Sequence, residues 1–263
     1  MRTRKAVARA VASSAPVVSE LPAVAAKAGI ALAQAQRRLQ AALEEMVTVH
    51  APLSSFLLNR VLVPLQTRAW ELDADADELR QLRALGEHHS LVFLPTHRSY
   101  ADTYVVMQLL RAAGMPPNHV LGGDNLRFFP LGTIARRAGG ILIRRSFRDD
   151  EIYKFALRAY FRFLVDRGGN LEWYMEGGRS RTGKLRPPRY GLLSYLVRAL
   201  EGSVREIFLV PLAITYDQLQ EVSAMAAEEA GGNKPKEGLG WLAGYLRDQG
   251  RPQGMAHVRF GEP

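Results

Sequence analysis

Short apolar runs alternate with helix-forming segments after His89, and this alternation restricts the fold more than any other feature of the chain. The runs have the length of buried strands, and the segments between them have the length of crossover helices. The runs are LVFLP (91–95), HVLGG (119–123), GILIRR (140–145), LEWYME (171–176), IFLVPLAITY (207–216) and HVRF (257–260). We therefore predict an α/β fold with a largely parallel mixed sheet flanked by helices, with functional loops at the carboxyl ends of the strands.

The crossover helices are expected at about 100–113, 129–138, 150–167 and 189–201. Before residue 88 the pattern is helical: residues 23–46 predict one helix, and residues 73–89 read as an Asp-capped helix ended by Gly86. The basic start is expected to form a frayed or weakly helical tail, or else to adhere to a membrane surface. We thus predict a helical N-terminal region (1–88) and an α/β domain (89–263).

Composition narrows the chemistry and the partners. The chain has no cysteine, which excludes thiolate metal sites and a cysteine nucleophile. Its formal charge of +9 suits anionic partners, namely nucleic acid, phosphate-bearing substrates, an acidic carrier protein or an anionic membrane surface. The apolar runs fall well short of the ~20 residues that span a bilayer, so no spanning helix is predicted.

The stretch EGGRSRTGK (176–184) nearly matches the phosphate loop of nucleotide hydrolases. That loop needs a Ser or Thr after its lysine to hold magnesium, and a helix that begins there. Here Leu185 follows the lysine, and Pro187 and Pro188 prevent a helix from starting. The stretch is therefore not expected to bind a nucleotide.

A glycine turn with three cations remains. Gly177 and Gly178 allow a close backbone approach, and Arg179, Arg181 and Lys184 follow directly. Arginine offers planar forks of donors to a phosphate, and lysine offers a point charge. The turn predicts an anion site, and a basic surface loop without a ligand is the alternative.

His97 and Asp102 follow the first predicted strand of the α/β domain, in LPTHRSYAD (94–102). If His97 lies just before a helix, Asp102 can accept a hydrogen bond from one ring nitrogen and leave the other free to take a proton from a hydroxyl. A hydrogen-bonded structural histidine is the alternative. No G-x-S-x-G stretch occurs, so the hydroxyl is expected to belong to the substrate. The other histidines lack the spacing of metal ligands, and no metal is expected.

HRSYAD (97–102) resembles the HX4D block of the glycerolipid acyltransferases, in the form found in the glycerol-3-phosphate acyltransferases. Three further blocks resemble that family in the same order, at 123–147, 174–188 and 209–217. Together the four span about residues 91–217, and NKPKEGLGWL (233–242) and VRFGEP (258–263) also look like later parts of the bacterial enzyme. The resemblance implies further chain beyond residue 263.

The resemblance implies direct transfer of a fatty acyl group from acyl-CoA or acyl-acyl carrier protein to the sn-1 hydroxyl of glycerol 3-phosphate, without a cofactor. His97 is then the general base and Asp102 orients it. Of two neighbouring arginines on a strand, Arg145 is expected at the phosphate and Arg144 in a solvent-exposed or interdomain salt bridge. The other expected substrate contacts are Arg98, Asn125, Glu176, Gly177, Gly178, Arg179, Ser180, Arg181 and Lys184.

Alternatives remain within and outside this family. Another acceptor, dihydroxyacetone phosphate or lysophosphatidate, fits the same blocks. A non-catalytic basic protein that binds membranes or nucleic acid is the rival from another class, although no nucleic-acid recognition motif is present. The lipid substrates imply a peripheral protein on the cytoplasmic face of the cell membrane, with an anionic membrane surface as partner and no nucleic acid.

Overall fold

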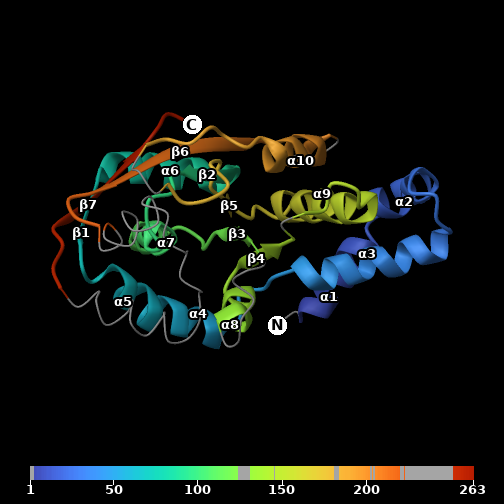
Figure 1. The fold of residues 1–263 in the computed structure, drawn as a ribbon, viewed down its shortest axis with the longest axis horizontal. Helices are drawn as coiled ribbons and strands as arrows, with labels where there is room; N and C mark the ends of the chain where they lie inside the picture. Colours follow the sequence, from blue (N-terminus) through green and yellow to red (C-terminus); the bar gives the residue numbers. More distant parts are fainter. Residues whose placement is uncertain are drawn as a thin grey trace. The chain divides into compact units, whose positions relative to one another are not determined.

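The computed structural model describes residues 3–123, 131–144, 146–180, 184–201, 203, 205–219, 222 and 251–263 (Figure 1). Contacts group the chain into two compact units. The first unit comprises Met1–Ser54, His119–Asn170 and Tyr190–Ile207, and the second comprises Ser55–Asn118, Leu171–Arg189 and Phe208–Pro263. The units interleave along the chain and do not divide at residue 88, so the predicted domain boundary stays a prediction.

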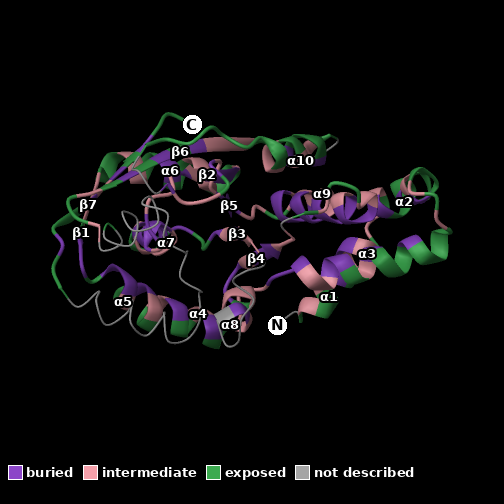
Figure 2. Ribbon diagram, in the orientation of Figure 1, coloured by how far each residue is buried: buried purple, intermediate pink, exposed green. Residues whose placement is uncertain are grey.

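The first unit is mainly helical. Its helices are α1 (Arg4–Ala12), α2 (Ala15–Lys27), α3 (Leu32–Met46), α8 (Leu131–Arg137), α9 (Glu151–Val165) and α10 (Gly191–Leu200). Helix α3 packs along α9 and α1, and α9 carries a long buried face (Figure 2). The side chain of Asp150 caps α9 by accepting a hydrogen bond from the backbone N–H of Tyr153.

Two helical predictions in this unit were wrong. Residues 23–46 do not form one helix, because Gly29 adopts a left-handed φ of 65° and ends α2. The N–H groups of Ile30 and Gly29 bond back to Ala25 and Ala26, an arrangement that satisfies the last carbonyls of a helix. The start of the chain is not a frayed tail, since α1 buries Val11 completely.

Among the described residues, the second unit holds five strands in the order β1-β7-β6-β2-β5. Their bounds are β1 (Glu71–Ala74), β7 (Met255–Phe260), β6 (Ile207–Tyr216), β2 (Ser90–Pro95) and β5 (Leu171–Glu172). Strand β1 pairs in parallel with β7, β2 pairs in parallel with β5, and β6 runs antiparallel to β7. In the first unit, β3 (His119–Gly123) pairs in parallel with β4 (Gly140–Ile143). The predicted α/β class with largely parallel strands is confirmed.

Individual strands differ from their predictions. Strand β1 lies in the region predicted to be helical. Its partner β7 is about 180 residues away in the sequence, at Met255–Phe260, so the local pattern could not reveal the pairing. The strand predicted at 171–176 ends at Glu172, since the chain turns at once and the N–H of Gly177 bonds to the carbonyl of Tyr174. Strand β4 ends at Ile143 rather than at residue 145.

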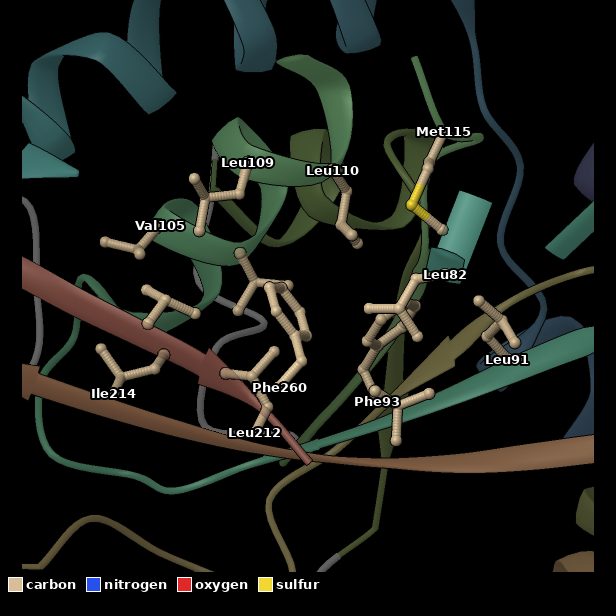
Figure 3. Close-up of a cluster of buried hydrophobic side chains, with 13 residues drawn as sticks. Leu82, Leu91, Phe93, Val105, Leu109, Leu110, Met115, Leu212, Ile214 and Phe260 are labelled. Atoms are coloured by element: carbon tan, nitrogen blue, oxygen red, sulfur yellow. The ribbon is translucent and has the colours of Figure 1, made fainter. Parts of the chain in front are cut away.

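A hydrophobic core in the second unit fixes the elements that carry the site (Figure 3). Phe93 of β2 and Leu212 of β6 face Leu109 and Val105 of α7 (Asp102–Ala112), and Leu82 of α6 (Ala76–His88) joins the same cluster. Phe93 and Val105 are completely buried. The core therefore holds both ends of the loop that joins β2 to α7.

Candidate active site

The loop between β2 and α7 brings His97 and Asp102 into contact. Nδ1 of His97 lies 2.9 Å from Oδ2 of Asp102. The Asp102 side chain is completely buried, whereas 23% of the His97 side chain is exposed. Because His97 lies outside the helix, five residues of separation permit the pairing that a regular helix would prevent. The contact expected from the sequence is present.

Asp102 accepts more hydrogen bonds than the one from His97. The backbone N–H groups of Arg98 and Ser99 donate to Oδ2 at 2.6 and 2.9 Å. The hydroxyl of Tyr216, the last residue of β6, donates to Oδ1 at 2.6 Å. Oδ2 thus fixes the loop through two backbone N–H groups and also orients the imidazole, while Oδ1 accepts the tyrosine hydroxyl. Tyr216 was not predicted as a site residue, although it lies in the fourth family block.

The glycine turn at 176–180 lies against this loop, because β2 and β5 are parallel neighbours whose carboxyl ends meet. Oε1 of Glu176 accepts the backbone N–H of His97 at 3.1 Å, and Oε2 accepts that of Arg186 at 3.3 Å. The N–H of Ser180 donates to the carbonyl of His97 at 2.8 Å. Glu176 and Ser180 are both buried and join the two loops.

Gly177 has a left-handed φ of 63°, which a side chain would strain. A Cβ at this position would also lie 2.6 Å from Cδ of Arg189. Glycine is therefore needed both for the turn and for the close approach of that arginine.

Several cations gather around the turn. The guanidinium of Arg179 lies 4.4 Å from the ring centre of Tyr100, and its Nη1 is buried without a hydrogen-bond partner in the described part of the chain. Arg98 donates to the carbonyl of Lys184 at 2.9 Å. Arg186 and Arg189 add two arginines that the sequence analysis missed, since their approach depends on the turn. Such a set can hold a phosphate.

Three expected substrate contacts, Asn125, Arg145 and Arg181, lie outside the described residues, and their roles stay predictions. Arg144 is described, and it forms a salt bridge with Glu45 at 2.6 Å and a second with Asp150 at 3.3 Å. The expected salt bridge of Arg144 is therefore present, within the first unit.

A second buried carboxylate lies behind the site. Glu172 is completely buried, and it accepts hydrogen bonds from the Thr103 hydroxyl and the Asn118 amide, each at 3.0 Å. Burial raises the pKa of Glu172 to about 7, against the lowering effect of these hydrogen bonds, and the charge of Asp102 raises it further. The sequence analysis took this residue for part of a strand and assigned it no role.

The glycine turn lacks the helix that a nucleotide-binding phosphate loop needs. Residues 185–190 form no helix, so none follows the lysine of the glycine turn. The described residues include no group of three or more His, Asp or Glu side chains arranged to hold a metal ion. The site is thus a histidine–carboxylate pair beside a cationic turn.

Two models of protein families match parts of the chain. A family model described as "Acyltransferase" matches residues 77–215, more than half of the chain. The chain belongs to the acyltransferase family. A second model, described as the glycerol-3-phosphate acyltransferase C-terminal region, matches residues 225–263. The family predicted from the four sequence blocks is therefore confirmed.

Curated relatives include proteins named "Putative acyltransferase plsB1" from Mycobacterium tuberculosis and Mycobacterium bovis. This acyltransferase chain is 45% identical to them over 197 residues, which are 74% of the chain and 32% of each relative. The chain thus spans about a third of the length of these relatives. A solved structure, the 1-acyl-sn-glycerophosphate (LPA) acyltransferase PlsC from Thermotoga maritima, matches with a TM-score of 0.46 and 15% identity, over 78% of this chain and 68% of that one.

The raised pKa of Glu172 should make the stability of the protein depend on pH. Folding raises the pKa of Glu172 from 4.5 to about 7, because the buried site favours the protonated carboxyl. The stability that the protonated Glu172 contributes is fully present below pH 4.5 and is lost as the pH rises to about 7. The change corresponds to about 3 kcal/mol. We expect Glu172→Gln to remove this loss, so that the variant gains stability relative to the wild type between pH 4.5 and 8 in urea unfolding.

Glu87→Gln, which changes an exposed carboxylate of α6, is the matched control and should keep the wild-type pH dependence. Equal pH dependence in Glu172→Gln and the wild type would show that the carboxylate titrates normally.

Proposed function

We propose that the chain carries the acyl-transfer site of a glycerol-3-phosphate acyltransferase. The contact between His97 and the buried Asp102, beside a cationic turn, is the observation that supports this proposal most. A base next to a phosphate site suits an acceptor that carries a hydroxyl and a phosphate on a short chain. The family membership and the matching C-terminal region point the same way.

The reaction needs only the substrates and the residues of the chain. Nε2 of His97 takes the proton of the sn-1 hydroxyl while the hydroxyl oxygen attacks the thioester carbonyl carbon. Asp102 stabilises the imidazolium that forms. The carbon–sulfur bond then breaks, and the leaving thiolate of CoA or acyl carrier protein receives the proton. An ester and a free thiol result, without a covalent enzyme intermediate and without a cofactor.

The cationic turn holds the acceptor phosphate in this proposal. Arg179 is the first candidate ligand, because its Nη1 has no partner among the described residues. Arg98, in the loop between β2 and α7, donates a hydrogen bond to the carbonyl of Lys184, which follows the glycine turn. Arg145 and Arg181 remain proposed ligands on the family resemblance. Glu176 and Ser180 act through the loop geometry that they maintain.

We also propose a peripheral position on the cytoplasmic face of the cell membrane. Phe56 and Leu57 at the end of α4 (Pro52–Leu57) and Val61 in the π-helical turn η1 (Leu58–Leu62) are exposed by 58%, 39% and 42%. No acidic residue occurs between positions 47 and 70. Exposed apolar side chains beside Arg60 suit an anionic bilayer surface. Among the described residues no single helix is long and apolar enough to span a membrane, although α2 and α3 pass that test as a pair bent by 113°.

The function is tested with radiolabelled glycerol 3-phosphate and either acyl-CoA or acyl-acyl carrier protein. We expect the wild type to form lysophosphatidate and His97→Ala to lose this activity with its circular dichroism spectrum retained. His88→Ala, which removes an exposed histidine of α6, should remain active. Near-normal turnover in His97→Ala would eliminate the mechanism.

Competing acceptors in the same assay separate the alternatives. A preference for dihydroxyacetone phosphate or lysophosphatidate over glycerol 3-phosphate would reassign the acceptor. Salt-sensitive DNA binding by a protein that transfers no acyl group to any of them would favour the non-catalytic alternative.

Arg179→Ala tests the phosphate assignment. Loss of a charged hydrogen bond should reduce kcat/KM for glycerol 3-phosphate. The decrease should correspond to a loss of about 1.5–3 kcal/mol of transition-state stabilisation. Arg111→Ala, which removes an exposed arginine from α7, should leave this constant unchanged. An Arg179→Ala variant with wild-type acceptor dependence would remove Arg179 from the phosphate site.

Sedimentation with lipid vesicles tests the membrane proposal. We expect binding to phosphatidylglycerol vesicles that decreases with salt, and weaker binding by the double variant Phe56→Ser and Val61→Ser. Equal binding of wild type and variant would exclude Phe56 and Val61 as membrane contacts. Failure of the wild type to bind would contradict the membrane position.

A further inference from the structure

The aromatic ring of Tyr174 lies against the imidazole of His97. Their ring centres are 4.1 Å apart and the rings are inclined by 25°, a stacked arrangement. Tyr174 comes two residues after β5, and His97 comes two residues after β2. These strands are parallel neighbours in the register Phe93↔Glu172, so the fold brings the two rings together.

The hydroxyl of Tyr174 is fixed at its far end. It lies 2.6 Å from Oγ1 of Thr103, which donates to Oε1 of Glu172 at 3.0 Å. A threonine hydroxyl has one proton, so when it donates to Glu172 the tyrosine hydroxyl donates to Thr103. Tyr174 and Glu172 also interact directly through their side chains. Asn118 holds the other oxygen of Glu172 at 3.0 Å. A chain of hydrogen bonds therefore runs from the buried carboxylate to the ring that contacts His97.

The hydrogen bond from Nδ1 to Asp102 does not fix the plane of the imidazole, because the ring can still rotate about the line through the two bonded atoms. A flat partner against its face removes that tilt. The direction of Nε2 then depends on both contacts, and misplacement of a reacting group by about 1 Å can cost roughly a hundredfold in rate.

We infer that Tyr174 is a positioning residue for His97, a platform anchored through Thr103 on the buried Glu172, which sets the plane of the imidazole while Asp102 sets its tautomer. The inference rests on the proposed function, in which Nε2 takes the hydroxyl proton. It assigns a purpose to a buried carboxylate that touches neither His97 nor the cationic turn through any hydrogen bond that the structure shows.

The anchor tolerates a change of charge. The groups that face Glu172 are Thr103 and Asp102 of α7, Asn118, and Tyr174. A protonated Glu172 can donate to Thr103, which then donates to the tyrosine oxygen, so the chain of hydrogen bonds closes in either state. Burial raises the pKa of Tyr174 well above its ordinary value, which keeps its hydroxyl protonated in both states.

Variants at position 174 separate positioning from folding. Tyr174→Leu removes the platform, and we expect kcat to decrease roughly tenfold or more while KM for glycerol 3-phosphate stays within about twofold. Tyr174→Phe keeps the ring and loses only the anchor, so it should restore most of that loss. Tyr190→Leu, which removes an exposed tyrosine, is the control and should match the wild type. A smaller decrease in kcat for Tyr174→Leu, or an equal change in KM, would overturn the inference.

A measurement that needs no activity accompanies the kinetics. Stacking on Tyr174 displaces the NMR signals of the His97 ring protons through the ring current, and Tyr174→Leu should abolish that displacement. Unchanged His97 signals would overturn the platform even if the wild type transferred no acyl group. An inactive wild type whose His97 signals do respond would instead contradict the proposed function alone. If Tyr174→Leu does not fold, Thr103→Val decides: an unchanged kcat would overturn the anchor, and a decrease at constant KM would support it.

Discussion

The candidate site depends on one buried carboxylate, that of Asp102. It is completely removed from solvent and accepts four hydrogen bonds, two of them from the backbone of Arg98 and Ser99. The His97 ring and the Tyr216 hydroxyl supply the others. An unpaired charge in such a place would cost several kcal/mol, so the loop, the imidazole and the end of β6 must keep their places around it.

Glu176 has a similar effect on the second loop. Its two oxygens accept the backbone N–H groups of His97 and Arg186, and the turn that follows needs the left-handed backbone of Gly177. The acidic residue of the glycine turn is thus hydrogen-bonded within the protein, and under the proposed function the cations beside it bind the acceptor phosphate. A stretch that resembles a nucleotide loop in sequence lies, in three dimensions, beside the pair of His97 and Asp102.

The sequence predicted what depends on local pattern. Strand β6 and the pairing of His97 with Asp102 follow from apolar runs and from a spacing of five residues across a helix start. Partners distant in sequence could not be predicted: β1 needs β7, and Tyr174 meets His97 only because β2 and β5 are neighbours. Glu172 was missed because an acidic residue within an apolar run has no local signal of burial. Gly29 did carry a local signal, the glycine that ends a helix, and the prediction of one helix at 23–46 overlooked it.

Nitrogen-15 NMR of the His97 ring tests the central claim most directly, with its signals assigned by their loss in His97→Ala. The claim is that Asp102 holds a proton on Nδ1 and leaves Nε2 free to act as the base. In the neutral ring we expect Nδ1 to be protonated and Nε2 to show the chemical shift of a bare nitrogen. A neutral ring with its proton on Nε2 would contradict the account, because the nitrogen that must accept the substrate proton would already carry one.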